Sequence, residues 1–520
     1  MILSALSQGT ARLLRPARPE REEVQEGFAL LAAGVRGRQS LPRGADGDRG
    51  RLRLPRGTDG AEGRRSPPRG GARRRNRVPA LLAALWLSGC AAADFDLGHG
   101  STPPEAAAAV SPALYAEFCA VSQIRKRPGF GADIRGGIGG HAVFYLHGAC
   151  RDRDARYPVL RLCDPSRPGE PEGAGLSMNS NYRNAKWVAT DGPGFFFEGG
   201  LRPGERLTRA RYRQAQAEAA AQGIFDGVEF HETSFAAMPP GMSRRDWMYE
   251  ISVATDYAIA FGRGRYCARV PVGRAAMGRM VAFLNAENAP YRAGQREFRW
   301  NIFNDNCAHL AHNALAAAGL WAEWPTGRPL LVSVFDFPVP RNEFVNTALR
   351  ANDMPIDDLD AVWADAAARR SVLRAAELPT RPGALVSAVP PWRDNDLYET
   401  DLALIFYDDA ITSRYQRRFD RLFAEARFHD AEANLAHFAA LYARIRAARQ
   451  PPEGWLRRHG QAAPAERARL AAFHARYYEA VDAAAASVAT RLALLRAAVP
   501  RGEASRADGP GAAGAPSCRC

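Results

Sequence analysis

The hydrophobic pattern changes once along this 520-residue chain, and the change limits the folds open to it. From 112 to 340, short strand-like runs alternate with turn clusters and with three helical patterns. From 399 to 498, apolar residues recur at helical spacing. The first region lacks a repeated strand–helix unit and is typical of an α+β domain. The second predicts an α-helical C-terminal domain of two or three packed amphipathic helices.

The individual elements expected inside these regions follow from local composition and spacing. The expected strands are His141–Leu146, Tyr157–Leu162, Trp187–Thr190, Phe195–Phe197, Met248–Val253 and Tyr266–Val270. The expected helices of the α+β domain are Glu205–Gln222, Arg274–Asn288 and Cys307–Gly319. Residues 341–398, rich in Pro, Asp and Ala, are interpreted as a partly helical connector, and 499–520 as a disordered tail.

The basic charge of the chain is concentrated near its N-terminus. The formal net charge is +14, and residues 1–78 hold eighteen Arg and no Lys against eight acidic residues. The remainder is close to balanced, so nucleic acid is not predicted as a partner. Residues 35–77 contain almost no large apolar side chains and cannot form a core. We therefore interpret 1–72 as a disordered extension or the product of a wrongly chosen start codon.

A different signal occupies 73–89. Five residues that include four Arg (73–77) precede ten mostly apolar residues (78–87), a combination typical of a secretory signal peptide and too short to span a bilayer. The sequence Leu-Ser-Gly-Cys that ends at Cys90 resembles the bacterial lipobox. That resemblance implies lipidation of Cys90, a tether over 90–111, and attachment to the periplasmic face of the outer membrane.

Cysteine usage agrees with an exported protein. The candidates for disulfides are Cys119, Cys150, Cys163 and Cys267, in a connectivity that the sequence leaves open. Two further cysteines, 518 and 520, fall in the C-terminal tail. No two cysteines are separated by two intervening residues, as in zinc sites, and Cys518-Arg-Cys520 has the wrong spacing, so neither a metal nor a cofactor is predicted. Cys307 remains as the thiol of chemical interest.

The residues around Cys307 favour a nucleophile. Asp305 or Asn306 is suited to cap the helix that begins there, which places the thiol in the first turn. The unpaired amides and positive dipole end of that turn stabilise a thiolate and can donate to an oxyanion. His309 and His312 lie at spacings that do not stack on Cys307, so we interpret them as packing or surface residues. A base from another element is needed, and His141 begins a predicted strand; the alternative is that Cys307 is a buried core residue.

A histidine on an early strand, followed by Asn306-Cys307-Ala308-His309 at the start of a helix, resembles the circularly permuted papain-like fold. The motif is similar to the Asn-Cys-Glu-His of the lecithin:retinol acyltransferase family, relatives of NlpC-type peptidases, with Ala308 in place of Glu. The layout over about residues 130–320 also resembles the Lnb-type N-terminal periplasmic domain family. The matching segments are Gly140-His141, a strand at Trp247–Ile251, the helix Arg274–Asn288 and Phe303–Cys307.

The resemblance implies roles for individual residues. Cys307 would be the nucleophile and His141 its base, with Asn306 and His309 supporting the substrate or the oxyanion. Asp164 is the first choice for the group that orients His141, and His147 and Asn179 are alternatives.

The implied function is that of a membrane-anchored periplasmic cysteine hydrolase or acyltransferase. It would act on an amide or ester of the cell envelope, in peptidoglycan, a lipoprotein or a lipid. The alternative is a non-catalytic envelope lipoprotein that uses the papain-like domain as a scaffold and the helical domain to bind a partner.

Overall fold

We analysed a computed structural model of the chain. It describes residues 92–93, 113–127, 140–196, 201–202, 204–257, 262–326, 339–400, 404–405, 408, 414–460 and 462–498. The expected N-terminal extension, the signal peptide, Cys90 and the C-terminal tail lie outside the described residues. Of the expected tether, only Ala92–Ala93 is described, as strand β1, which pairs with β10 (Leu404–Ile405).

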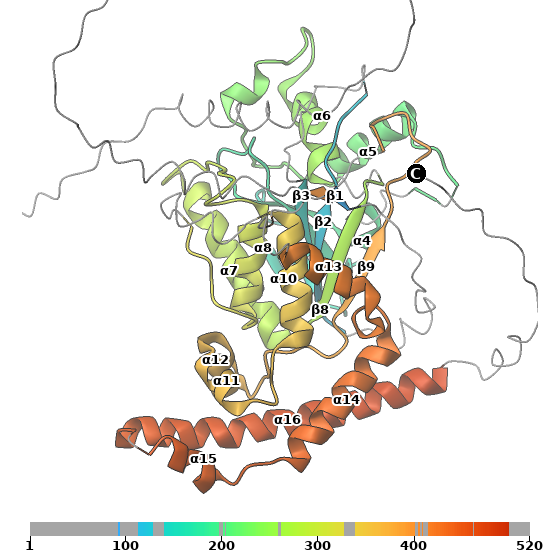
Figure 1. The fold of residues 1–520 in the computed structure, drawn as a ribbon. Coiled ribbons are helices and arrows are strands. Elements are labelled where there is room, and N and C mark those ends of the chain that lie inside the picture. The colour runs from blue at the N-terminus through green and yellow to red at the C-terminus, as the bar shows by residue number, and fades with distance from the viewer. Residues whose placement is uncertain are drawn as a thin grey trace, which may run out of the picture. The chain divides into compact units, whose positions relative to one another are not determined.

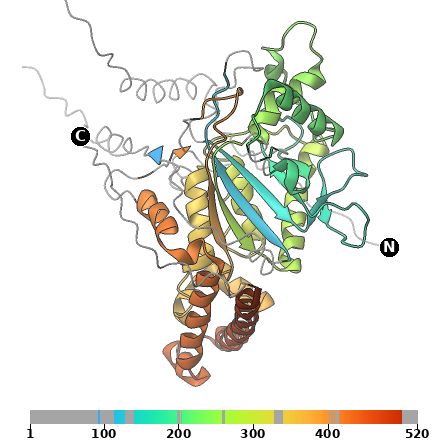
Figure 2. The ribbon, with the colours of Figure 1, turned by 90° about the vertical axis from the view of Figure 1, so that its right-hand side faces the viewer.

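A six-stranded sheet organises the α/β part of the molecule (Figure 2). Its strand order is β7 (Val188–Asp191), β6 (Gly173–Ser177), β3 (His141–His147), β2 (Tyr115–Val121), β8 (Arg265–Pro271) and β9 (Leu385–Val389). All five pairings between these strands are antiparallel. A separate ribbon joins β4 (Ala149–Arg151) to β5 (Leu160–Leu162). The expected strands at His141, Trp187 and Tyr266 are thus confirmed.

The two faces of the sheet bury different side chains, because successive residues of a strand point to opposite sides. Phe118 of β2 and Phe144 of β3 belong to the large core on one face. Cys119, which follows Phe118, and Val143, which precedes Phe144, belong to a small cluster on the other face. That cluster also contains Phe196. Since β2 and β3 are covered on both sides, their sequences show little polar alternation.

The helices that cover the large-core face lie side by side in Figure 1. They are α7 (Arg274–Arg292), α8 (Cys307–Ala317) and α10 (Pro340–Asp353). Helix α8 packs on β3, and α10 packs on β2 and β8. Two further helices, α5 (Arg209–Ala221) and α6 (Arg244–Asp256), contact each other, and the short elements α4 (Gly192–Phe196) and η1 (Glu232–Phe235) complete the set. The helices expected at Glu205, Arg274 and Cys307 are confirmed with small changes of boundary.

Three strand predictions need correction. Met248–Val253 is helical and lies within α6, where Ser243 Oγ accepts a hydrogen bond from Asp246 N at the helix start. The alternation of large apolar residues there imitates a strand, but the cap sets the helix. Phe195 and Phe196 fall in α4, and Phe197 lies outside the described residues. Of Tyr157–Leu162, only the last three residues form a strand.

The segment interpreted as a connector takes part in the α/β core. Besides α10, it forms α11 (Leu359–Ala364), α12 (Ala366–Ala375) and β9, which pairs with β8 along five residues. Phe344 and Ala348 of α10 are buried in the large core. Residues 341–398 therefore complete the sheet and one of its faces.

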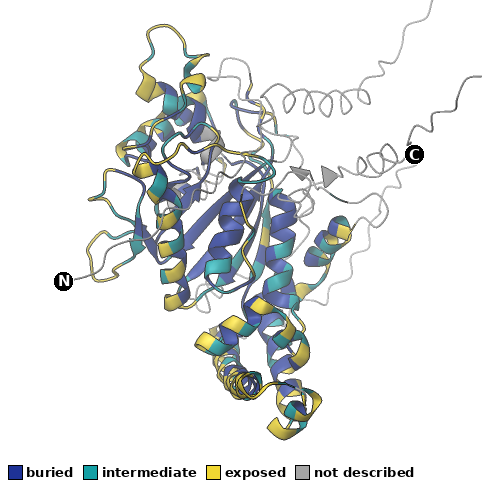
Figure 3. Ribbon diagram, turned by 90° about the vertical axis from the view of Figure 1, so that its left-hand side faces the viewer, coloured by how far each residue is buried: buried dark blue, intermediate teal, exposed yellow. Residues whose placement is uncertain are grey.

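A helical region follows, as the sequence predicts. It contains α13 (Arg414–Ala424), η4 (Ala426–Phe428), α14 (Ala431–Ala447), α15 (Pro452–Arg458) and α16 (Pro464–Ala498). Phe419 of α13 is buried in the large core, whereas α14, α15 and α16 share a second core with α11 and α12 (Figure 3). Asn434 of α14 accepts from Gly383 N at 2.7 Å and donates to Asn352 Oδ1 at 2.9 Å. Among the described residues, no helix is long and apolar enough to cross a membrane.

Candidate functional site

A tight turn leads into α8. Asn301 and Asp305 exchange two backbone hydrogen bonds, both with N···O distances of 3.0 Å. The Asn301 side-chain oxygen also accepts from Phe303 N at 2.9 Å and from Asn304 N at 3.1 Å. Backbone and side-chain bonds together fix the direction from which the chain enters the helix.

Asn306 caps the helix, as the sequence analysis expects. Its Oδ1 accepts from Ala308 N at 2.9 Å and from His309 N at 3.1 Å, while its Nδ2 donates to Ile302 O at 2.6 Å. Cys307 is therefore the first residue of α8. It is not part of a disulfide and is 9% exposed.

The two histidines that follow Cys307 are buried and pack. His309 Nδ1 lies 3.0 Å from the Asn306 cap oxygen, so its ring supports the cap. The His312 ring stacks between Trp321 and Trp324, with centroid distances of 4.2 and 3.7 Å. Its Nδ1 lies 2.9 Å from Glu343 Oε1, a contact that joins α8 to α10.

His141 begins β3 and is 7% exposed. Its Nε2 lies 2.8 Å from Ser177 Oγ at the end of the adjacent strand β6. Burial, and secondarily the charge of Arg263, lowers the pKa of His141 to about 3. The ring is therefore neutral near pH 7, the state a general base requires.

The elements that carry Cys307 and His141 meet through several contacts. Helix α8 packs directly on β3. Upstream of the helix, Phe298 N donates to Arg183 O at 2.7 Å. Arg183 belongs to the loop that leaves β6 just after Ser177, the partner of His141. The chain that leads to the thiol and the strand that holds the imidazole are thus tied to the same loop.

Lys186 reinforces that connection. Its side chain is 3% exposed, and its Nζ lies 2.8 Å from Asp305 Oδ1 and also pairs with Glu287 of α7. Burial opposes the charge of Lys186, but the two carboxylates outweigh it and raise the pKa of the amine. For Asp305, burial is the larger influence and raises the pKa, and Lys186 opposes it. A buried ion pair thus holds the residue before the cap.

The three candidates for the group that orients His141 lie in different parts of the structure. Asp164 is exposed beyond β5, where its Oδ1 accepts from Ser166 N at 3.0 Å and Ser166 Oγ at 2.6 Å. His147 ends β3, six residues and about 20 Å from His141, and stacks on Tyr115. Asn179 is buried two residues after Ser177.

The hydroxyl that contacts His141 belongs to Ser177, which was not among the candidates. The strand Gly173–Ser177 contains no β-branched or aromatic residue, so its sequence does not predict a strand or draw attention to Ser177.

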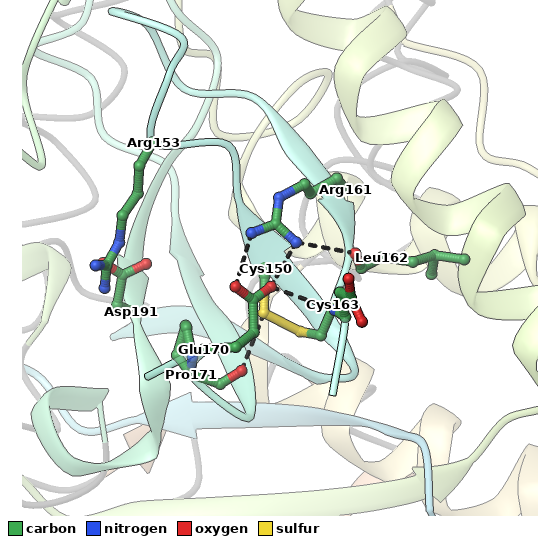
Figure 4. The surroundings of a disulfide bond; sticks show 9 residues. Cys150, Arg153, Arg161, Leu162, Cys163, Glu170, Pro171 and Asp191 are labelled. Carbon is green, nitrogen blue, oxygen red and sulfur yellow. Dashed lines mark hydrogen bonds and ion pairs between the residues drawn. A yellow bond between two sulfur atoms is a disulfide. The ribbon is translucent and has the colours of Figure 1, made fainter. Parts of the chain in front are cut away.

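The four candidate cysteines form two disulfides. Cys119–Cys267 links β2 to β8 at directly opposed positions, and Cys150–Cys163 closes the small ribbon. Figure 4 shows the second bridge with Arg161 and Glu170 paired beside it. Glu117 and Glu170 each lie near one disulfide. Because the four sulfur atoms are bonded in two pairs, the two clusters do not present the thiolates that a zinc site uses.

No protein-family model, no curated protein and no solved structure matches this chain. A thiol opens a capped helix on the large-core face of the sheet. A buried imidazole in contact with a hydroxyl opens β3, and strand alternation places it on the opposite face. Residues of these types support nucleophilic attack on a carbonyl carbon followed by acyl transfer.

Proposed function

We propose that this chain is a cysteine hydrolase or acyltransferase with a circularly permuted papain-like arrangement, in which Cys307 is the nucleophile and His141 the base. The observation that carries the proposal is the capped start of α8, which holds the unbridged Cys307 in the first helical turn. By strand alternation His141 points to the face of the sheet opposite α8, so the action of His141 on the thiol is the part that the experiment below decides. The histidine strand precedes the cysteine helix in the chain, as the permuted arrangement requires.

The proposed reaction begins with proton transfer from the Cys307 thiol to the neutral His141 imidazole. Ser177 Oγ holds Nε2, and Nδ1 is the nitrogen that we propose accepts the proton. The thiolate attacks the carbonyl carbon, and the positive dipole end of α8 stabilises the negative oxygen. When the intermediate collapses, His141 returns its proton to the leaving amine or alcohol, and a thioester remains on Cys307. Water or a second acceptor then attacks the thioester.

We place this activity in the cell envelope, on the periplasmic side of a lipid-anchored chain. Two observations support export: the sequence that resembles a lipobox at Cys90, and the disulfides at Cys119–Cys267 and Cys150–Cys163, which persist in oxidising compartments. The substrate would be an amide or ester of peptidoglycan, a lipoprotein or a lipid.

Alkylation of Cys307 by iodoacetamide, followed by mass spectrometry of its peptide, tests the pair. In the wild type, the rate should exceed that of a simple thiol near neutral pH, and His141→Ala should lower it about tenfold or more. His147→Ala, at the other end of the same strand, is the matched control and should keep the wild-type rate. Equal rates for wild type and His141→Ala, with both proteins folded by circular dichroism, would contradict the proposed pair.

One observation favours the non-catalytic alternative: Cys307 is nearly buried and belongs to the large core. If the papain-like part is only a scaffold, Cys307 should react more slowly than a simple thiol at every pH. His141→Ala should then leave the rate unchanged or raise it by loosening the core. The direction of the His141 effect therefore separates the enzyme from the scaffold.

A further inference from the structure

A small hollow lies at the C-terminal end of α8, the helix that begins at Cys307. Its volume is about 210 Å³, and its lining comes from α7, the end of α8 with the residues just after it, and α12. Because α8 runs from Cys307 to Ala317, the hollow lies about 15 Å along the helix from the thiol. It is therefore separate from the reaction proposed above.

The lining of the hollow is mainly basic. Arg279 of α7 and Arg370 and Arg374 of α12 line it, together with a single acidic residue, Glu323. Arg370 and Arg374 are exposed, and neither forms an ion pair with a residue that the structure describes. They are four residues apart on one helix, so they lie on the same face, where like charges repel. An anion placed between them would relieve that repulsion.

The third arginine is already oriented. Arg279 donates from Nε to Ala317 O at 2.9 Å and from Nη2 to Ala318 O at 3.3 Å, so it binds the last carbonyl groups of α8. Its Nη1 makes no hydrogen bond within the described part of the chain. A guanidinium group that is fixed before a ligand arrives loses little entropy when the ligand binds.

The charge near the hollow is not balanced by the carboxylates beside it. Glu377 lies 3.9 Å from Arg279 and 3.7 Å from Arg381, so two cations share one carboxylate. Burial lowers the pKa of Arg381, and Glu377 opposes that shift. The charges of Arg279 and Arg350 lower this pKa further. Basic groups thus act on one another on the side of the hollow that α7 forms.

Two small residues complete the lining. Gly319 ends α8 with a φ of +90°, and a Cβ there would lie 3.2 Å from Ser371 Oγ, so glycine suits this position. Ser371 is 7% exposed, and its Oγ has no hydrogen-bond partner among the residues described. A buried hydroxyl group needs an acceptor, and an anionic oxygen is a strong one.

We propose that this hollow binds a terminal phosphate group and that Arg279, Arg370 and Arg374 hold it. The lining carries three positive charges and one negative charge, and the excess matches the charge of about −2 on a phosphate monoester. A carboxylate would balance only half of it. The hollow is smaller than the roughly 300–1,000 Å³ of sites that enclose a drug-sized molecule, so it admits the phosphate and few further atoms. The ligand is thus a soluble phosphate monoester or a lipid with a terminal phosphate.

Inorganic phosphate is the probe for the first test on the full chain. Its binding is followed by the ³¹P line width at fixed pH and ionic strength. Replacement of both Arg370 and Arg374 by glutamine should weaken binding about tenfold or more, since two charge-assisted contacts are lost. Acetate at equal ionic strength should not displace the phosphate.

The matched control removes two other arginines. Arg213 of α5 and Arg417 of α13 are also exposed, form no ion pair with a described residue and do not line the hollow. Replacement of both by glutamine changes the net charge equally and should leave phosphate binding unchanged. The same affinity in wild type and in the Arg370→Gln, Arg374→Gln variant overturns the proposal, as does an equal loss in the control or displacement by acetate.

Vesicles then distinguish the two sources of the phosphate. If the wild type floats with vesicles of phosphatidylcholine and phosphatidic acid, and the Arg370→Gln, Arg374→Gln variant does not, the ligand is a lipid headgroup. If the two proteins float equally or not at all while their affinities for phosphate differ, the ligand is a soluble monoester. The iodoacetamide rate at Cys307 should be the same in all these proteins, so failure of the phosphate site and failure of the Cys307–His141 pair are seen in different measurements.

Discussion

At the scale of single residues, the two lysines stand out because 68 of the 70 basic residues are arginine. Both lysines are buried: Lys126 contacts the Tyr212 hydroxyl at 3.2 Å, and Lys186 pairs with Asp305 and Glu287. A compact ammonium group with three donors fits between converging acceptors, whereas a planar guanidinium group needs more space. The local geometry explains the choice of lysine at 186.

Removal of Lys186 should destabilise the protein strongly. Lys186→Met leaves the partly exposed Asp305 and Glu287 carboxylates without their cation, which should cost about 2–3 kcal/mol, between the values for an exposed and a fully buried pair. The matched control is Arg183→Met, three residues earlier, because the exposed Arg183–Glu229 pair contributes about 0–1 kcal/mol. The free energy of unfolding from urea titrations measures both. Equal losses in the two variants would show that the Lys186 contacts are not buried in solution.

The buried imidazole of His141 should make stability depend on pH. Its folded pKa of about 3 lies below the ordinary histidine value of 6.5, so the unfolded chain binds a proton more readily in the interval between them. The contribution of His141 is complete above about pH 6.5 and is lost as the pH falls, by at most about 1.4 kcal/mol per pH unit. Urea titrations at pH 7, 6 and 5 should show a steeper decline for the wild type than for His141→Asn. Parallel declines would mean that His141 is hydrated in the folded state.

At the scale of elements, the start of α8 depends on one side chain. Asn306→Ala removes the acceptor for two backbone amides and for the His309 ring, and should cost about 1–2 kcal/mol. Because the first turn also carries Cys307, the iodoacetamide rate should fall as well. Asp358→Ala removes the corresponding cap of α11 in the second core and is the control: it should cost a similar free energy and leave the Cys307 rate unchanged. A loss of reactivity in both variants would indicate a global effect.

The elements also show why some predictions fail. The cap at Asn306 is encoded within four residues, so the helix that begins at Cys307 could be predicted. In α6, the alternation from Trp247 to Val253 imitates a strand, and the local signal that decides the matter is Ser243 followed by Asp246. With α6 helical, one of the segments matched to the Lnb-type layout is a different element from the one that the resemblance implies.

At the scale of the whole molecule, the Cys119–Cys267 disulfide joins residues 148 positions apart, whereas Cys150–Cys163 joins residues 13 apart. In the chain-entropy view, a bridge that closes a longer loop restricts the unfolded chain more. Replacement of both cysteines by alanine should therefore cost about 2 kcal/mol more at the first pair than at the second. Guanidinium titrations without reductant measure the two losses. The reverse order would show that strain or packing, and not loop length, governs these bridges.

The sheet itself depends on residues that are distant in the chain. Its edge strand β9 comes from the segment interpreted as a connector, and α10 and α13 add Phe344 and Phe419 to the core beneath it. No local pattern announces these contacts, because they depend on which apolar face meets which strand after the chain has turned back.

Sequence alone determined the mixed α/β character, the helical C-terminal region, the capped helix at Cys307 and the four cysteines available for disulfides. These features depend on spacing, caps and composition over a few residues, which propensity and periodicity report directly. Only the tertiary structure decided that Ser177 contacts His141, that Lys186 holds Asp305 and how the cysteines pair. Those relations join residues 13 to 148 positions apart, and they arise only when the strands have found their order.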